Sequence, residues 1–198
     1  MADVLGSVHG AAPAVDALER ALEACARDIE ERGLRPITIE HVAERAGMDA
    51  AALCRLSPWA DLRAKAYERV EYAMIDSIFP LGAKSELVME TWLSEAFGPR
   101  TTRAWQRWSD AWEMSVEDAA FAAAFARVQN HYFEELARVL QSGPWRLPDP
   151  EGTAMRLFAL EDGFSSQIMS CAPFLNRKRA EAVLRGAFEA ECRLSALI

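Results

Sequence analysis

The sequence predicts an all-α protein. Apolar residues recur at helical spacing along nearly the whole chain, and glycine, proline and serine interrupt these runs at intervals. The alternation of apolar and polar residues that is typical of strands is absent. The 198 residues are enough to bury the core of one large or two small domains. We therefore expect about nine helices, preceded by a loose tail over residues 1–14.

The first three helices are expected to be short and well delimited. The first covers residues 15–32 and ends at Gly33, because glycine readily adopts the left-handed conformation that closes a helix. Thr38 can cap a second helix that stops before Gly47. Asp49 can cap a third, which ends at the following Ser-Pro break. This order predicts a three-helix domain with a tight turn between its last two helices.

Six further helices are expected, and glycine or proline separates most of them. The stretch Ser115-Val-Glu-Asp118 is similar to a capping box and is expected to open the seventh helix. The segment SGPWRLPDPEG is the longest expected loop. The expected ranges are 59–79, 85–97, 102–114, 115–141, 152–170 and 174–197.

Composition argues against several functional classes. The formal charge of −8 disfavours nonspecific affinity for nucleic acid or anionic membranes. No apolar run is long enough to span a membrane, and the first 13 residues lack the pattern of a signal peptide. Four separated cysteines form no metal-binding motif, so we expect no metal, no cofactor and a reducing, cytoplasmic location. These cysteines fall inside helical patterns and are Cys25, Cys54, Cys171 and Cys192.

Residues 15–62 resemble the N-terminal DNA-binding domain of the TetR family of regulators. The stretch ALEACARDIEERGLRPITIEHVAERAGMD carries the resemblance, Ala46-Gly47-Met48-Asp49 matches the family's turn, and Leu53 matches its core leucine. The segments WLSEAF, RAWQRWSDAW and ALEDGF are similar to the BetI-like branch. The resemblance implies a helix–turn–helix domain over 15–62 and a ligand-binding and dimerisation domain over 63–198. It also implies a homodimer that pairs through the last two helices.

The expected DNA-facing surface departs from the family pattern. Family members usually place polar or basic side chains along the third helix, whereas this chain has AAALC followed by Arg55. Residues 1–64 hold seven arginines, no lysine and eleven acids, a net charge of −4. Operator DNA is therefore an expected partner that would receive few phosphate contacts. The candidate DNA-binding residues are Thr38, His41, Arg45, Asp49, Ala50, Ala52 and Arg55.

The second domain offers a candidate pocket for a small molecule, which we expect to be apolar or aromatic. Three tryptophans of the sixth helix share one face, either as core or as the wall of a pocket. On the seventh and eighth helices, two glutamates lie on apolar stripes, where a carboxylate is costly unless it is paired. His131 could pair with Glu135 one turn later. The candidate pocket residues are Trp105, Trp108, Trp112, Phe125, Val128, His131, Tyr132, Glu135, Glu161 and Phe164.

Two main functions follow from these observations. The first is a ligand-responsive transcriptional repressor that binds operator DNA as a homodimer. The alternative is a TetR-fold protein that has lost DNA binding and acts as an enzyme or a small-molecule binding protein. In that case His131 and Glu135 would be the candidates for acid–base work. The sequence contains no nucleophile elbow, P-loop or dinucleotide fingerprint, so we assign no catalytic residue. A third option is a regulator that acts through a protein partner.

Overall fold

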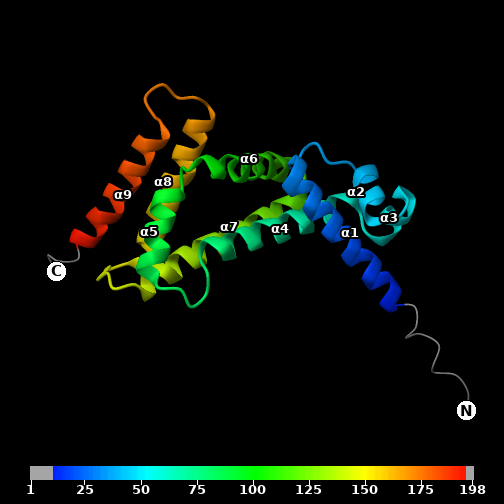
Figure 1. The fold of residues 1–198 in the computed structure, drawn as a ribbon, viewed down its shortest axis with the longest axis horizontal. Coiled ribbons are helices and arrows are strands. Elements are labelled where there is room, and N and C mark those ends of the chain that lie inside the picture. The colour runs from blue at the N-terminus through cyan, green and yellow to red at the C-terminus, as the bar shows by residue number, and fades with distance from the viewer. Residues whose placement is uncertain (1–10, 195–198) are drawn as a thin grey trace, which may run out of the picture. The chain divides into compact units, whose positions relative to one another are not determined.

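The computed structural model describes residues 11–194, and within this range it contains only helices, which confirms the all-α prediction (Figure 1). A short 3-10 helix, Pro99–Thr101, precedes α6. Residues 1–10 of the expected tail lie outside the described range, and residues 11–14 belong to α1. The nine α-helices are α1 (Ala11–Arg32), α2 (Ile39–Ala46), α3 (Ala50–Leu56), α4 (Trp59–Ile78), α5 (Ser85–Glu95), α6 (Thr102–Glu117), α7 (Ala119–Ser142), α8 (Pro150–Met169) and α9 (Arg177–Leu194).

The helices form two compact units that are discontinuous in sequence. The first unit combines the described residues up to Glu71 with Ser109–Arg127. The second combines Tyr72–Trp108 with the described residues from Val128 onward. Consequently α4, α6 and α7 each contribute one end to each unit. The boundary expected after residue 62 stays a prediction, because these units divide the chain according to where its helices pack.

The first unit contains the helix–turn–helix. Helix α1 packs against both α2 and α3. Cys25 and Ile29 of α1, Val42 of α2 and Leu53 of α3 are completely buried at their meeting point, which fits the core role expected of Leu53. Burial of each large aliphatic side chain stabilises the folded state by about 1.5–3 kcal/mol, so this small core fixes the relative placement of α2 and α3.

The ends of α2 and α3 are formed by the residues that the sequence predicts. Thr38 Oγ1 accepts a hydrogen bond from the backbone of His41, and Asp49 Oδ1 accepts one of 2.7 Å from the backbone of Ala52. Gly47 closes α2 with a φ of 69°, where a side chain would be strained. The expected caps of both helices are therefore confirmed.

The junction of α6 and α7 differs from the expected one. Ser115 lies inside α6, and its hydroxyl donates to the carbonyl of Trp112. Asp118 caps α7 instead, since its Oδ1 accepts hydrogen bonds from the backbone of Ala120 and Phe121. The expected capping box at Ser115 is wrong because the carboxylate three residues later satisfies the first amides of α7.

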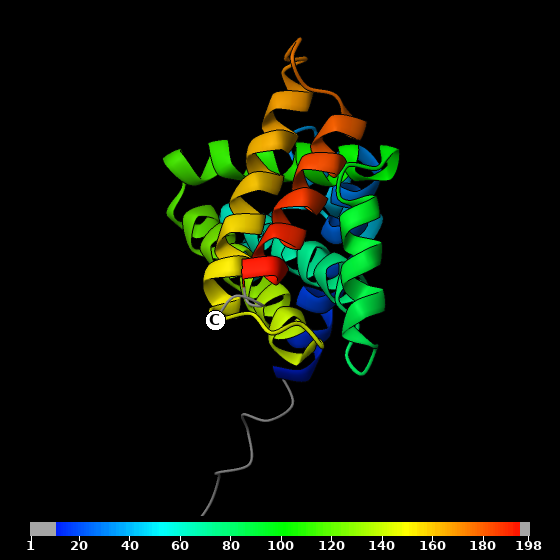
Figure 2. The same ribbon diagram turned by 90° about the vertical axis from the view of Figure 1, so that its left-hand side faces the viewer.

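In the second unit, α8 packs against α9, and α9 also packs against α5. Helices α8 and α9 run side by side in opposite directions (Figure 2). Asp149 caps α8 and Pro150 is its first residue, so α8 starts earlier than expected. Helix α9 starts three residues later than expected, at Arg177. Cys171 follows the end of α8 with a φ of 56°, so this cysteine lies outside a helix.

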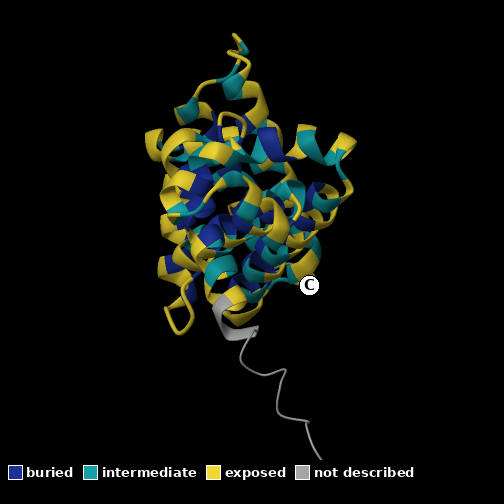
Figure 3. Cartoon of the chain, turned by 90° about the vertical axis from the view of Figure 1, so that its right-hand side faces the viewer, coloured by how far each residue is buried: buried dark blue, intermediate teal, exposed yellow. Residues whose placement is uncertain are grey.

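Buried and exposed residues alternate along most helices, as amphipathic packing requires (Figure 3). The expected apolar stripe of α7 is buried in full and comprises Phe121, Phe125, Val128, Tyr132, Leu136 and Val139. Among the described residues, no helix has the length and apolar character that crossing a membrane requires.

Candidate functional site

The exposed surface of α3 is small and nearly uncharged. Ala51, Cys54 and Arg55 are exposed, whereas Leu53 points into the core. Ala50 and Ala52 are half-buried. The side chains of Thr38 and Asp49 serve as caps, as described above. Arg55 is thus the long donor that α3 presents at its surface.

Arg45, one of the residues expected to face DNA, and Arg35, which precedes α2, are both bound to carboxylates within the first unit. Arg45 of α2 contacts two acids of α1, with Nη2 at 2.9 Å from Asp28 Oδ1 and Nη1 at 3.0 Å from Glu31 Oε1. Arg35 pairs with Asp110, at 3.2 Å, and with Glu113, both on α6. Asp28 is only 1% exposed, so Arg45 compensates a buried charge. Arg45 is therefore placed to hold α2 on α1.

His41 is also turned partly away from solvent. Its Nδ1 is buried and has no hydrogen-bond partner among the described residues. Of the residues expected to face DNA, the structure thus leaves Arg55 as the exposed charged side chain on α3.

The second unit contains a chain of hydrogen bonds that connects three helices. Trp92 Nε1 of α5 donates to the hydroxyl of Tyr132 on α7 at 2.8 Å. The Tyr132 hydroxyl in turn donates to Glu161 Oε2 on α8 at 2.7 Å. An indole N–H can only donate, so Tyr132 accepts from Trp92 and keeps its own O–H to donate to the carboxyl group of Glu161. The sequence singled out Tyr132 and Glu161, and the structure brings them together.

Aromatic rings surround this chain. Phe79 meets Tyr132 edge-on at 5.3 Å between ring centroids, and Phe158 stacks on it at 5.2 Å. Trp108 meets Phe158 edge-on at 6.0 Å. Tyr132 is buried, whereas Phe158, Trp108 and Glu161 are half-buried, so the group is accessible from the side of α8 and α6. We call Trp92, Trp108, Tyr132, Phe158 and Glu161 the aromatic–carboxylate cluster.

Burial changes the acidity of the cluster. It raises the pKa of Glu161 from its ordinary 4.5 to about 7; the hydrogen bond from Tyr132 opposes this rise and neighbouring Asp162 adds to it. Burial also raises the pKa of Tyr132 well above its ordinary value, so the phenol stays protonated. Burial raises the pKa of Asp162 as well, against a hydrogen bond with Trp108 that favours its charged form. The cluster therefore holds two acidic groups, and no cation among the residues that the structure describes is paired with them.

Other candidate pocket residues have different partners. The guanidinium of Arg177 lies 4.8 Å from the ring of Trp105, which is itself buried beside Phe97. Phe164 packs on the other side of Phe97 at 6.1 Å. Arg177 therefore already covers one face of the Trp105 ring, and this face is not available to a ligand.

The expected pair of His131 and Glu135 does not form. His131 Nε2 lies 3.0 Å from Asp76 on α4, and its ring packs on Tyr72. Glu135 Oε2 accepts from Arg138 Nε at 2.8 Å. Each residue has a partner in range that the one-turn spacing did not reveal, so the pair gives no support to acid–base chemistry.

The remaining candidates take no part in the hydrogen-bond chain of Trp92, Tyr132 and Glu161. Trp112 and Phe125 belong to the first unit, where Trp112 is 60% exposed and Phe125 is buried. Val128 is fully buried in the second unit. The sequence did not mark Trp92, which occurs in the motif WLSEAF. Its position on a short apolar helix is typical of an ordinary core residue, and its polar role depends on Tyr132, 40 residues away.

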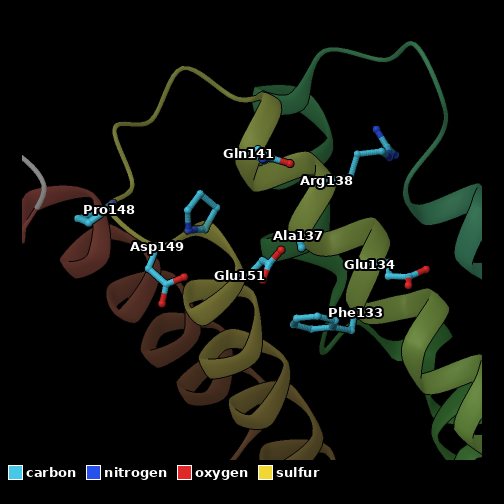
Figure 4. Close-up of a pocket in the computed structure, with 9 residues that line it drawn as sticks. Phe133, Glu134, Ala137, Arg138, Gln141, Pro148, Asp149 and Glu151 are labelled. Carbon is cyan, nitrogen blue, oxygen red and sulfur yellow. The ribbon is translucent and has the colours of Figure 1, made fainter.

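A separate open pocket of about 310 Å³ lies where α7 ends and α8 begins. Phe133 extends from α7 toward α8, and Asp149 and Glu151 line the opposite side (Figure 4). Arg138 directs its guanidinium away from this space, toward Glu135 and the carbonyl of Phe79 (Figure 4). The lining of this pocket is partly polar and partly apolar, and it shares no residue with the aromatic–carboxylate cluster.

Comparison with known protein families decides the identity of the chain. The family model of the BetI-type transcriptional repressor C-terminal domain matches residues 93–193, about half of the chain. The chain belongs to the TetR family of transcriptional regulators. No curated protein sequence matches this TetR-family chain.

Solved structures share the fold of this TetR-family regulator at low sequence identity. A TetR transcription regulator from Haloarcula marismortui has 19% identity and a TM-score of 0.66, over 89% of this chain and 97% of that one. A structure described as a transcriptional regulator from Saccharomonospora viridis, in complex with choline, has 19% identity and a TM-score of 0.65, over 88% and 96% of the two chains. At this level of identity the similarity establishes the fold alone.

Proposed function

We propose that this protein is a ligand-responsive repressor that binds operator DNA as a homodimer. The observation that carries the proposal is the complete helix–turn–helix, with both caps and the left-handed Gly47 in place and with the outer face of α3 exposed. This geometry is what a recognition helix needs to enter a major groove. Membership of the TetR family supports the same function.

DNA binding is expected to depend on few charges. Arg35 and Arg45 are engaged by carboxylates of their own unit, so their release for phosphate contacts would leave those acids uncompensated. Fewer phosphate contacts give weaker nonspecific binding and a shallower dependence on salt. The half-buried alanines of α3 can contact thymine methyl groups, which gives some preference for sequence.

Replacement of Arg55 by alanine is the mutation that tests this surface. We expect Arg55→Ala to weaken operator binding by about 10- to 100-fold, because one base or phosphate contact of arginine contributes about 1–3 kcal/mol. Fluorescence anisotropy on a labelled operator measures the change. Arg146→Ala, which removes the same charge from an exposed position of the second unit, is the matched control. Equal affinities of these two variants would exclude Arg55 from the DNA contact.

The ligand is proposed to be a small organic cation that binds at the aromatic–carboxylate cluster. The rings of Trp108, Tyr132 and Phe158 offer negative π-faces, and Glu161 offers a counter-charge beside them. Quaternary ammonium groups are commonly recognised by such rings. The choline in the Saccharomonospora viridis structure supports this class of ligand for a protein of the same fold.

The response is proposed to follow from a shift between two states of a dimer. Helices α8 and α9 are the expected dimer surface, and each carries an exposed apolar side chain, Met155 and Val183. A ligand that binds one state better than the other shifts the equilibrium toward that state. The two copies of α3 must match half-sites about one DNA turn apart, so the shift would alter operator affinity.

A further inference from the structure

Among the described residues, no cationic side chain is paired with Glu161 at the acidic end of the aromatic–carboxylate cluster. We propose that a cation bound beside Glu161 displaces the carboxyl proton of this residue to solvent, so that the regulator reads its ligand and the pH together. This inference rests on the proposed function, because it concerns the same site and the same class of ligand. It adds that binding is coupled to the release of a proton.

The hydrogen-bond chain leaves the proton of Glu161 free to depart. Trp92 donates to Tyr132, and Tyr132 donates to Glu161 Oε2, so Oε2 is the acceptor at the end of the chain. In this arrangement the proton of the neutral form is placed on Oε1, which takes no part in the chain. Removal of that proton breaks neither bond of the chain.

The groups that face Glu161 do not compensate its charge. They are Tyr132 from α7, which stays protonated, and Asp162 from its own helix, which is a second acid. Trp92 of α5 is hydrogen-bonded to Tyr132 and carries no charge. Among the described residues, no arginine, lysine or histidine is paired with Glu161. A bound cation would supply the missing positive charge and would favour the ionised form.

The linkage has a definite pH window. Because the pKa of Glu161 is about 7, the carboxyl group is about half protonated at neutral pH. Binding should release about 0.9 proton near pH 6, about 0.5 near pH 7 and about 0.1 near pH 8, if the cation suppresses protonation completely. Affinity should rise by up to about tenfold per pH unit below pH 7 and level off above it.

Titration calorimetry of the full-length protein measures the proton count directly. Tetramethylammonium chloride is a suitable probe, because it carries a permanent charge and no titratable group. The binding heat is compared near pH 6, 7 and 8 in phosphate and in Tris, whose ionisation enthalpies differ. Glu161→Gln keeps the acceptor for Tyr132 and removes the proton. Glu134→Gln is the matched control on an exposed carboxylate of α7.

The proton release measured in the three proteins tests the proposal as follows. Proton release that falls with pH in the wild type and in Glu134→Gln, and that is absent from Glu161→Gln, supports the proposal. Binding without proton release overturns the proposal and leaves the proposed function standing. Proton release that persists in Glu161→Gln overturns the assignment to this residue. No binding at any pH overturns the proposed class of ligand and this proposal with it.

Discussion

The Glu161→Gln variant is expected to be more stable than the wild-type protein near neutral pH. The pKa of Glu161 rises from 4.5 to about 7 on folding, so the folded state binds the proton more tightly than the unfolded chain. The contribution of Glu161 to the free energy of unfolding is therefore fully present below about pH 4.5. It is lost as the pH rises from there through about 7. The loss amounts to about 3 kcal/mol, at about 1.4 kcal/mol per pKa unit, and somewhat less because Glu161 is half-buried.

Urea unfolding at several pH values measures this effect. The stability advantage of Glu161→Gln should grow by about 2 kcal/mol between about pH 5.5 and pH 8 and should then stay constant. Glu134→Gln should follow the pH profile of the wild type, since its carboxylate is exposed. Parallel profiles for the wild type and Glu161→Gln would show that the carboxyl group is not desolvated in the folded protein.

A gain of stability at a proposed binding site has a functional meaning. A lone carboxyl group among aromatic rings costs free energy in the unliganded protein, and natural proteins retain such groups mainly where function needs them. The same substitution should remove the favourable interaction with a bound cation. We therefore expect Glu161→Gln to be stabilised and unresponsive at once.

The Arg45→Ala variant is expected to be destabilised by about 2–4 kcal/mol. Asp28 is almost fully buried and lies 2.9 Å from Arg45, so loss of the guanidinium leaves a buried carboxylate with Arg32 alone, at 3.5 Å. Removal of one partner of a buried ion pair typically costs about 3–5 kcal/mol, and the remaining Arg32 reduces this value. Urea unfolding at neutral pH measures the difference.

Two comparisons distinguish the buried ion pair of Arg45 and Asp28 from an ordinary surface ion pair. Arg27 pairs with Glu23 at an exposed position of the same unit, so Arg27→Ala should change stability by less than about 0.5 kcal/mol. Replacement of Asp28 by asparagine in the Arg45→Ala background should restore part of the loss, because it removes the uncompensated charge. A loss of stability in Arg45→Ala as small as that in Arg27→Ala would show that the ion pair of Arg45 and Asp28 does not stabilise the fold.

The sequence predicts the helix–turn–helix well because its determinants are local. Thr38 and Asp49 accept from amides three residues later, and the Gly47 amide donates to carbonyls three or four residues earlier, so their pattern can be read along the chain. Arg45 is paired with Asp28, 17 positions earlier, and Arg35 is paired with Asp110, on a helix far away in sequence. These roles therefore cannot be read from neighbouring residues. An arginine near a recognition helix therefore suggests a phosphate contact until its acidic partners are known.

The ligand site shows the same limit. Glu161 could be noticed because a carboxylate on an apolar stripe violates helical patterning, and that signal is local. Its partners Tyr132 and Trp92 come from two other helices. His131 and Glu135 looked like a pair because they are one turn apart, whereas tertiary contacts give each a different partner. Spacing identifies unusual residues, but packing decides what they bind.

Footprinting of the protein on the DNA upstream of its own gene, with and without tetramethylammonium at low salt, tests the central claim most directly. The account predicts one protected sequence with two half-sites about one DNA turn apart, and loss of this protection when the cation is added. No protected sequence even at low salt would contradict the proposed repressor. Protection that a saturating cation leaves unchanged would contradict the proposed response.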